Sequence, residues 1–138
     1  MESQKRIRVL MAKAGLDAHQ RGIMNISMGM KDDGLEVIYT GLRQTPGAVV
    51  KTAIEENVDV LGISSLAGGH IAFVKKIIQK AEEMGLKLSD LVFLVGGIIP
   101  PEDVKILKEM GVDETFGPGT TIKTITDYIR QNVKSNGS

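Results

Sequence analysis

An imidazole and a carboxylate lie two positions apart at His19 and Asp17, between an apolar run typical of a buried strand and a segment typical of a helix. Open α/β sheets bind their ligands at loops in this position. In extended backbone the two side chains leave on the same side, so the carboxylate can accept the N–H of the ring nitrogen that does not bind the ligand. Lys13, four residues before Asp17, is placed to keep that carboxylate ionised. The spacing predicts a Lys13–Asp17–His19 relay aimed at a ligand.

The composition limits the classes of protein to which the chain can belong. With 138 residues and 42% hydrophobic content, it is expected to form one domain over 1–138, with a core over about 6–133 and a flexible tail over 134–138. Lys plus Arg and Asp plus Glu both number 17, and aromatic residues make up 4%, so no nucleic-acid partner is expected. Without cysteine, signal-peptide core or membrane-length apolar run, the chain is expected to be a soluble cytoplasmic protein.

Short β-branched runs alternate with longer segments of helical periodicity, a pattern typical of βα units around a parallel sheet. Strands are expected over 6–12, 36–40, 58–64, 91–96 and 114–116. Helix boundaries are expected at Thr45-Pro46, at Gly85, after Pro100-Pro101, near Met110, and at about 121 and 133. The fold class is therefore α/β, a flavodoxin-like, Rossmann-like doubly wound sheet of order 2-1-3-4-5 with helices on both faces.

Two other folds with this architecture do not fit the loops. A dinucleotide-binding half requires GxGxxG after the first strand, where this chain has Ala12-Lys-Ala-Gly-Leu-Asp17. A phosphoacceptor receiver requires an acidic pair after strand one and an aspartate after strand three, where this chain has Ser64-Ser65-Leu66. Both functions are disfavoured.

The segment after His19 is expected to form the weakest helix, because Gly29 lies in its interior and each such glycine costs roughly 0.8 to 1 kcal/mol relative to alanine. Low intrinsic stability suits a segment that folds around its ligand. In the alternative interpretation, Gly29 permits close packing on the sheet and the nearby methionines fill the core.

Small residues gather where the later strands end. Gly62 and Ser64 belong to the third strand, Gly96 and Gly97 follow the fourth, and 117–120 follow the fifth. Side chains at these positions would fill the space beside the His19 loop, so their absence predicts a slot for a slender, partly apolar group. Each glycine taken singly is also consistent with ordinary turn chemistry.

The three loops together resemble a known family. Asp17-x-His19-x-x-Gly22, Ser64-x-Leu66 and Gly96-Gly97 are similar to the DxHxxG, SxL and GG motifs of cobalamin-binding domains from adenosylcobalamin-dependent mutases. The segments 13–22, 39–46, 97–103 and 116–120 look most like the methylmalonyl-CoA mutase branch, and the resemblance covers about 7 to 129. Ala14, Ala18 and Gln20 depart from the usual residues without removing a proposed ligand.

The resemblance implies roles for the motif residues. His19 would be the lower axial cobalt ligand, oriented by Asp17 and Lys13, with the dimethylbenzimidazole tail displaced from the metal. Gly22 would allow the backbone to approach the corrin, and Arg21 is counted among the cofactor-binding residues. Ser64 would hydrogen-bond the buried benzimidazole. The walls of the tail pocket would be Leu66, Gly96, Gly97, Phe116, Gly117 and Thr120.

The small number of possible metal ligands in the chain agrees with this resemblance. The chain has His19 and His70 and no cysteine, whereas imidazole metal sites normally need three or four protein ligands. The metal must therefore arrive already coordinated, as cobalt does in a corrin ring. His70 is expected at the surface or at the rim of the corrin, and we assign it no role.

The resemblance further implies a subunit of an isomerase that is not catalytically complete alone. Radical rearrangement in this family takes place in a TIM barrel, which needs about 250 residues, so a separate large subunit that binds the acyl-CoA is expected. The implied reaction interconverts methylmalonyl-CoA and succinyl-CoA with adenosylcobalamin. The alternatives are the small subunit of a 2-hydroxyisobutyryl-CoA or ethylmalonyl-CoA mutase, and a non-enzymatic cobalamin carrier or sensor. A methyl-transfer corrinoid protein is disfavoured, because only 1–5 precede the first strand.

Overall fold

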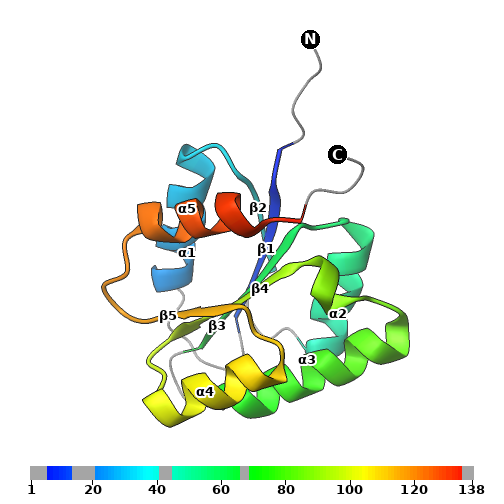
Figure 1. The fold of residues 1–138 in the computed structure, drawn as a ribbon. Helices are drawn as coiled ribbons and strands as arrows, with labels where there is room; N and C mark the ends of the chain where they lie inside the picture. Colours follow the sequence, from blue (N-terminus) through cyan, green and yellow to red (C-terminus); the bar gives the residue numbers. More distant parts are fainter. Residues whose placement is uncertain (1–5, 14–20, 41–44, 66–68, 135–138) are drawn as a thin grey trace.

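Five parallel strands form one sheet in the computed structural model, which describes residues 6–13, 21–40, 45–65 and 69–134. The sheet order is β2-β1-β3-β4-β5, as predicted (Figure 1). The strands are β1 (Arg8–Lys13), β2 (Glu36–Tyr39), β3 (Val60–Ser65), β4 (Val92–Gly97) and β5 (Glu114–Phe116). Their carboxyl ends therefore share one edge of the sheet, where the predicted ligand loops begin.

The helices are α1 (Arg21–Asp32), α2 (Pro46–Glu55), α3 (His70–Met84), α4 (Pro101–Met110) and α5 (Ile122–Asn132), with a short 3-10 turn at Leu88–Asp90. The predicted start of α2 is confirmed, because the Thr45 hydroxyl accepts a hydrogen bond from the Ala48 N–H at 3.1 Å and Pro46 is the first helical residue. The end of α3 at Gly85 is confirmed as well, where φ is 83°.

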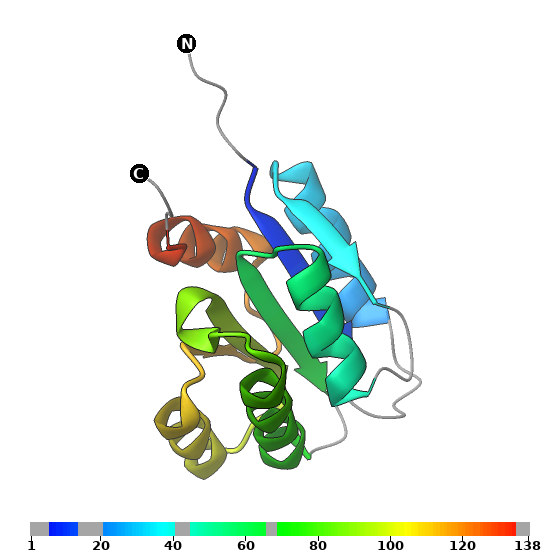
Figure 2. The same cartoon turned by 90° about the vertical axis from the view of Figure 1, so that its right-hand side faces the viewer.

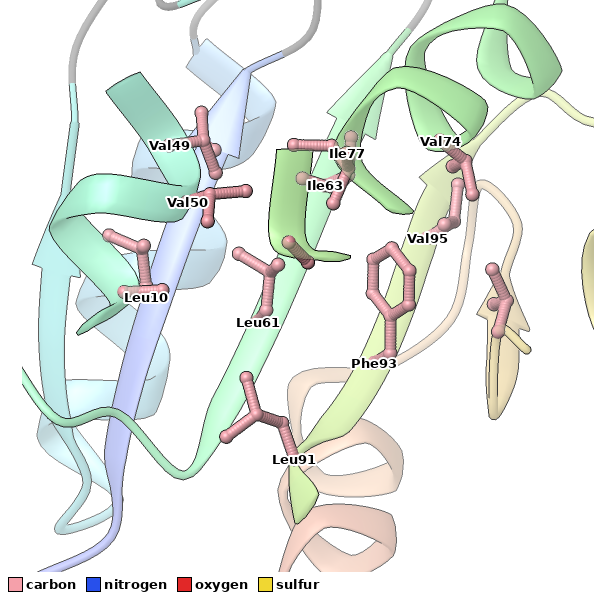
Figure 3. Close-up of a cluster of buried hydrophobic side chains, with 14 of the residues drawn as sticks. Leu10, Val49, Val50, Leu61, Ile63, Val74, Ile77, Leu91, Phe93 and Val95 are labelled. Carbon is pink, nitrogen blue, oxygen red and sulfur yellow. The ribbon is translucent and has the colours of Figure 1, made fainter. Parts of the chain in front are cut away.

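The helices cover both faces of the sheet (Figures 1 and 2). On one face, α2, α3 and α4 pack on side chains that include Leu61 and Phe93, and Figure 3 shows these side chains facing Val50 and Ile77. On the other face, α1 and α5 pack on alternate residues of the same strands. Strands buried on both faces are continuously apolar, which explains why the sequence pattern located them.

The bounds of β5 and the start of β2 are as predicted, and the other strand ends differ by one or two residues, because pairing rather than hydrophobicity ends a strand. Val58 and Leu91 are 4% and 6% exposed, yet each precedes the first paired residue of its strand. At the start of β1, the Asp59 carboxylate accepts a hydrogen bond from the Arg8 N–H at 2.9 Å. Within the described ranges, no helix combines the length and the apolar character needed to cross a membrane.

Gly29 permits close helix packing, but its neighbour is α5 rather than the sheet. A Cβ at Gly29 would collide with the side chain of Ile122, including its Cδ1 atom. The interpretation of the nearby methionines as core residues holds for Met30, which is 1% exposed. It is wrong for Met24 and Met28, which are 45% and 61% exposed.

The replacement Gly29→Ala is therefore expected to lower the free energy of unfolding by about 1 to 2 kcal/mol, because overpacking outweighs the gain in helix propensity. Urea unfolding measures the difference, and Gly29→Ala combined with Ile122→Ala is the control that restores space. A single variant more stable than the parent would show that helix propensity decides the stability of α1.

Candidate functional site

A cavity of about 220 Å³ lies on the α1 and α5 side of the sheet and reaches its carboxyl edge. The structure brings together six residues predicted for the tail pocket, and all of them line this cavity. They are Ser64, Gly96, Gly97, Phe116, Gly117 and Thr120. The carboxyl ends of β3, β4 and β5, together with the connection after β5, thus meet at one place.

The cavity exists because side chains are missing at neighbouring positions of two strands. Ser64 pairs with Gly96, and Gly62 pairs with Leu94, on the face that α1 and α5 cover. Among the described residues, a Cβ at Gly96 would have only the Phe116 carbonyl oxygen nearby, at 3.5 Å. Neither Gly62 nor Gly96 has a positive φ, so turn chemistry does not explain these two glycines. It does explain Gly97 and Gly119, where φ is 136° and 87°.

The walls are mostly aliphatic, with two side-chain hydroxyls at the carboxyl edge. Helices α1 and α5 contribute Ile23, Met30 and Ile125, among other residues. The Thr120 hydroxyl donates to the Gly117 carbonyl oxygen at 2.8 Å and is therefore already engaged. The side-chain hydroxyl of Ser64 makes no hydrogen bond within the described part of the chain, so it is available to a ligand.

The predicted metal-binding relay begins at the end of β1, where Lys13 is 1% exposed and pairs with Ser64. Burying an amine requires compensation, and Lys13 is not without an interaction partner. Asp17, His19 and Leu66 lie outside the described residues. Arg21 and Gly22 begin α1, but their side chains are not described. The relay itself therefore stays a prediction.

His70 was expected at the surface or at a ligand rim, and that expectation is wrong, because its side chain is buried and only 2% exposed. Its Nε2–H donates to the carbonyl oxygen of Ile98 at 3.1 Å, which ties the start of α3 to the connection after β4. The sequence held a signal for this burial. His70, Val74 and Ile77 follow the helical spacing of the buried face of α3.

Replacing His70 by alanine is expected to cost about 1 to 3 kcal/mol of unfolding free energy, because the carbonyl of Ile98 loses its donor. Chemical denaturation of His70→Ala beside His70→Gln, which keeps an N–H donor, measures this contribution. Equal stabilities for all three proteins would show that the hydrogen bond contributes nothing.

An ion pair joins α5 to the residue that directly follows α1. Arg130 on α5 contacts the Asp33 carboxylate at 2.9 Å and also donates to the Asp33 carbonyl oxygen. Hydrogen bonding by Thr126 and then by Arg130 lowers the pKa of Asp33 below its ordinary 3.8. The pair is exposed, so its contribution to stability is small and sensitive to salt.

Because the pKa of Asp33 is lowered by folding, its stabilisation is present above the unfolded value of 3.8 and is lost as the pH falls through the folded value. Asp33→Asn should therefore be less stable than the parent near neutral pH, and the difference should shrink in acid. Thermal unfolding at a series of pH values checks this. A difference independent of pH would assign the effect to the side-chain replacement rather than to the charge.

These features define an α/β domain with a five-stranded parallel sheet and a narrow apolar pocket at the carboxyl ends of its strands. Residues 7–125 match the family model described as B12 binding domain. The chain therefore belongs to the B12-binding domain family, as its motifs predicted.

The relatives are mutases or mutase subunits. The chain is 42% identical over 135 residues to the 2-hydroxyisobutanoyl-CoA mutase small subunit of Aquincola tertiaricarbonis, with 98% of each chain covered. It is also 42% identical over 130 residues to the mitochondrial methylmalonyl-CoA mutase of Homo sapiens, covering 94% of this chain and only 17% of that enzyme. The expectation that the chain is an enzyme subunit of the isomerase class is confirmed by these relatives.

Solved structures confirm the fold class alone. A response regulator receiver domain from Clostridium thermocellum superposes with a TM-score of 0.66 at 12% sequence identity, covering 91% of this chain and 92% of the receiver. In the receiver function considered above, an aspartate follows strand three, but Ser65 ends β3 here. The shared fold therefore does not transfer that function.

Proposed function

We propose that this chain is the cobalamin-binding small subunit of an adenosylcobalamin-dependent acyl-CoA mutase. The observation that carries the proposal is the end-to-end match with a mutase small subunit, 98% of both chains. The chain spans 17% of the human mutase, so the remaining machinery is proposed to reside in a separate large subunit. That subunit would carry the TIM barrel and bind the acyl-CoA.

The cavity fits the nucleotide tail of the cofactor in shape and chemistry. A volume of about 220 Å³ is too small for a corrin ring and suits a flat aromatic base. Aliphatic side chains from α1, α5 and the sheet would cover the faces of the base, while Ser64 would donate to its ring nitrogen. The glycines at the end of β4 and after β5 would let the backbone approach the linker between base and corrin.

The residues around the cobalt would hold it from one side. His19 would bind the metal through one ring nitrogen, and Asp17 would accept the N–H of the other, fixing the tautomer and the ring plane. Lys13, buried at the end of β1, would balance the charge of that carboxylate. When bound, adenosylcobalamin supplies a cobalt–carbon bond whose homolysis starts radical rearrangement. No residue of this chain is proposed to contact the acyl-CoA.

Two substrates are supported by specific observations. Sequence identity is 42% both to the small subunit of a 2-hydroxyisobutanoyl-CoA mutase and to a methylmalonyl-CoA mutase. The match along the whole small subunit favours the first, and the motif flanks at 13–22 and 97–103 favour the second. Substrate choice would be made in the large subunit, so this domain suits both reactions.

Co-expression with the large mutase subunit of the same organism tests the proposal. The purified complex is incubated with adenosylcobalamin and with methylmalonyl-CoA or 2-hydroxyisobutanoyl-CoA, and the rearranged thioester is quantified. Isomerisation is expected only when both subunits and the cofactor are present. Tight cobalamin binding without association or turnover would instead identify a carrier or sensor.

A further inference from the structure

The floor of the cavity is formed by Met11 lying on Gly62. These residues pair across β1 and β3, and both line the cavity. A Cβ built on Gly62 would lie 2.8 Å from the Met11 Sδ and 3.4 Å from its Cε. The thioether therefore occupies the space that a side chain at residue 62 would need, and Met11 as a whole is 8% exposed.

This floor lies below the Ser64 hydroxyl, on the same face of the sheet. Residues two apart along a strand are separated by about 6.6 Å, so Gly62 is one step deeper in the cavity than Ser64. That distance is comparable to the length of a fused two-ring base. A base that places a ring nitrogen at Ser64 would therefore direct its far edge at Met11.

The polarity of the cavity changes over this distance. The two hydroxyls, Ser64 and Thr120, belong to the carboxyl edge, whereas the deep end holds Met11 with Val9 and Leu94. An amino group at the far edge of a base would be buried there without an acceptor side chain, which is costly. An apolar edge would instead contact a polarizable thioether that packs favourably against aromatic rings.

We propose that Met11, seated on Gly62, determines which tail base the subunit accepts, favouring a methyl-substituted benzimidazole over an adenine. The inference rests on the proposed function, because it concerns the cofactor of that same site. Met11 acts as a specificity-determining residue for the corrinoid and contacts neither cobalt nor acyl-CoA.

Spectroscopic titration of the isolated chain with three corrinoids tests the inference. The probes are cobalamin, the cobamide that carries adenine, and cobinamide, which has no base. The parent protein is expected to bind cobalamin at least about 10-fold more tightly than the adenine cobamide. Met11→Gln, which places an amide at the floor, should reduce or reverse that preference, whereas the apolar control Met11→Leu should keep it. Cobinamide affinity should be the same for all three proteins.

The pairing of Met11 with Gly62 is tested by a double-mutant cycle. Gly62→Ala should push the thioether into the cavity and weaken the binding of both cobamides by about 10-fold or more. Gly62→Ala with Met11→Ala should recover cobalamin binding relative to Gly62→Ala alone. Circular dichroism of the unliganded variants confirms that each one is folded.

The possible outcomes distinguish failure of the proposed function from failure of the role proposed for Met11. A parent protein that binds cobalamin with its base still on the cobalt, and no more tightly than cobinamide, would contradict the proposed function. Base-off binding together with an unchanged preference in Met11→Gln, or with no recovery in the double variant, would overturn the role of Met11 alone. If Met11→Gln does not fold, the cycle at Gly62 decides the question.

Discussion

Replacing His19 by alanine is expected to abolish the imidazole-bound spectrum of added cobalamin and to weaken its binding by more than about 100-fold. The reason is that His19 is proposed as the only protein donor to the metal, so no other residue compensates for its loss. His70, the second histidine of the chain, is buried and donates to Ile98, which removes it from competition for the cobalt. Ultraviolet–visible titration of the purified chain measures both effects.

Two further measurements test whether the effect of His19→Ala comes from the loss of a metal ligand. Free imidazole added to His19→Ala should restore the lost spectrum, because the variant leaves the axial position open. Asp17→Asn should weaken binding by about 10- to 100-fold while keeping the imidazole-bound spectrum, as expected for a residue that orients a ligand. An unaltered spectrum in His19→Ala would reject the ligand assignment and with it the relay from Lys13.

The fold could be predicted from the sequence because its signals are local. Strands covered on both faces are apolar without interruption, and Thr45-Pro46 and Gly85 mark helix ends by their own backbone and capping chemistry. The cavity could also be predicted, since the carboxyl ends of parallel strands must share an edge. Ser64 and Gly96 meet there through the register of β3 and β4.

The features that the sequence did not predict are contacts between distant segments. Gly29 faces Ile122 on another helix, Arg130 pairs with Asp33 across 97 positions, and Met11 lies on Gly62. Periodicity indicates which face of an element is buried, but it does not identify the partner side chain or the space left between them. The burial of His70 was not predicted, although its helical spacing with Val74 and Ile77 offered a signal for it. Its acceptor, the carbonyl of Ile98, is set by the tertiary fold.

The cavity itself leads to the second large prediction, that Gly96→Leu blocks the entry of a nucleotide tail without unfolding the domain. Alternation along β4 places Gly96 on the cavity face with Leu94, while Phe93 and Val95 face α3 and α4. The backbone of Gly96 needs no positive φ, and within the part of the chain that the structure describes a Cβ there would contact only the Phe116 carbonyl oxygen, at 3.5 Å. The side chain of a leucine at this position would therefore extend into the cavity and fill it without disturbing the fold.

The expected result is a loss of cobalamin affinity of more than about 100-fold, because the leucine side chain would occupy the space that the inserted base needs. Cobinamide has no base to insert, so its affinity should be retained. Gly47→Leu is the matched control, since Gly47 lies on α2 across the sheet and the nearest described neighbour of a Cβ there would be the Lys80 side chain, at 3.8 Å. Unfolding curves for both variants should stay within about 1 kcal/mol of the parent. If Gly96→Leu bound cobalamin as the parent does, the base would have to enter elsewhere, and the alignment of Ser64, Gly96 and Phe116 around one cavity would have no part in holding it.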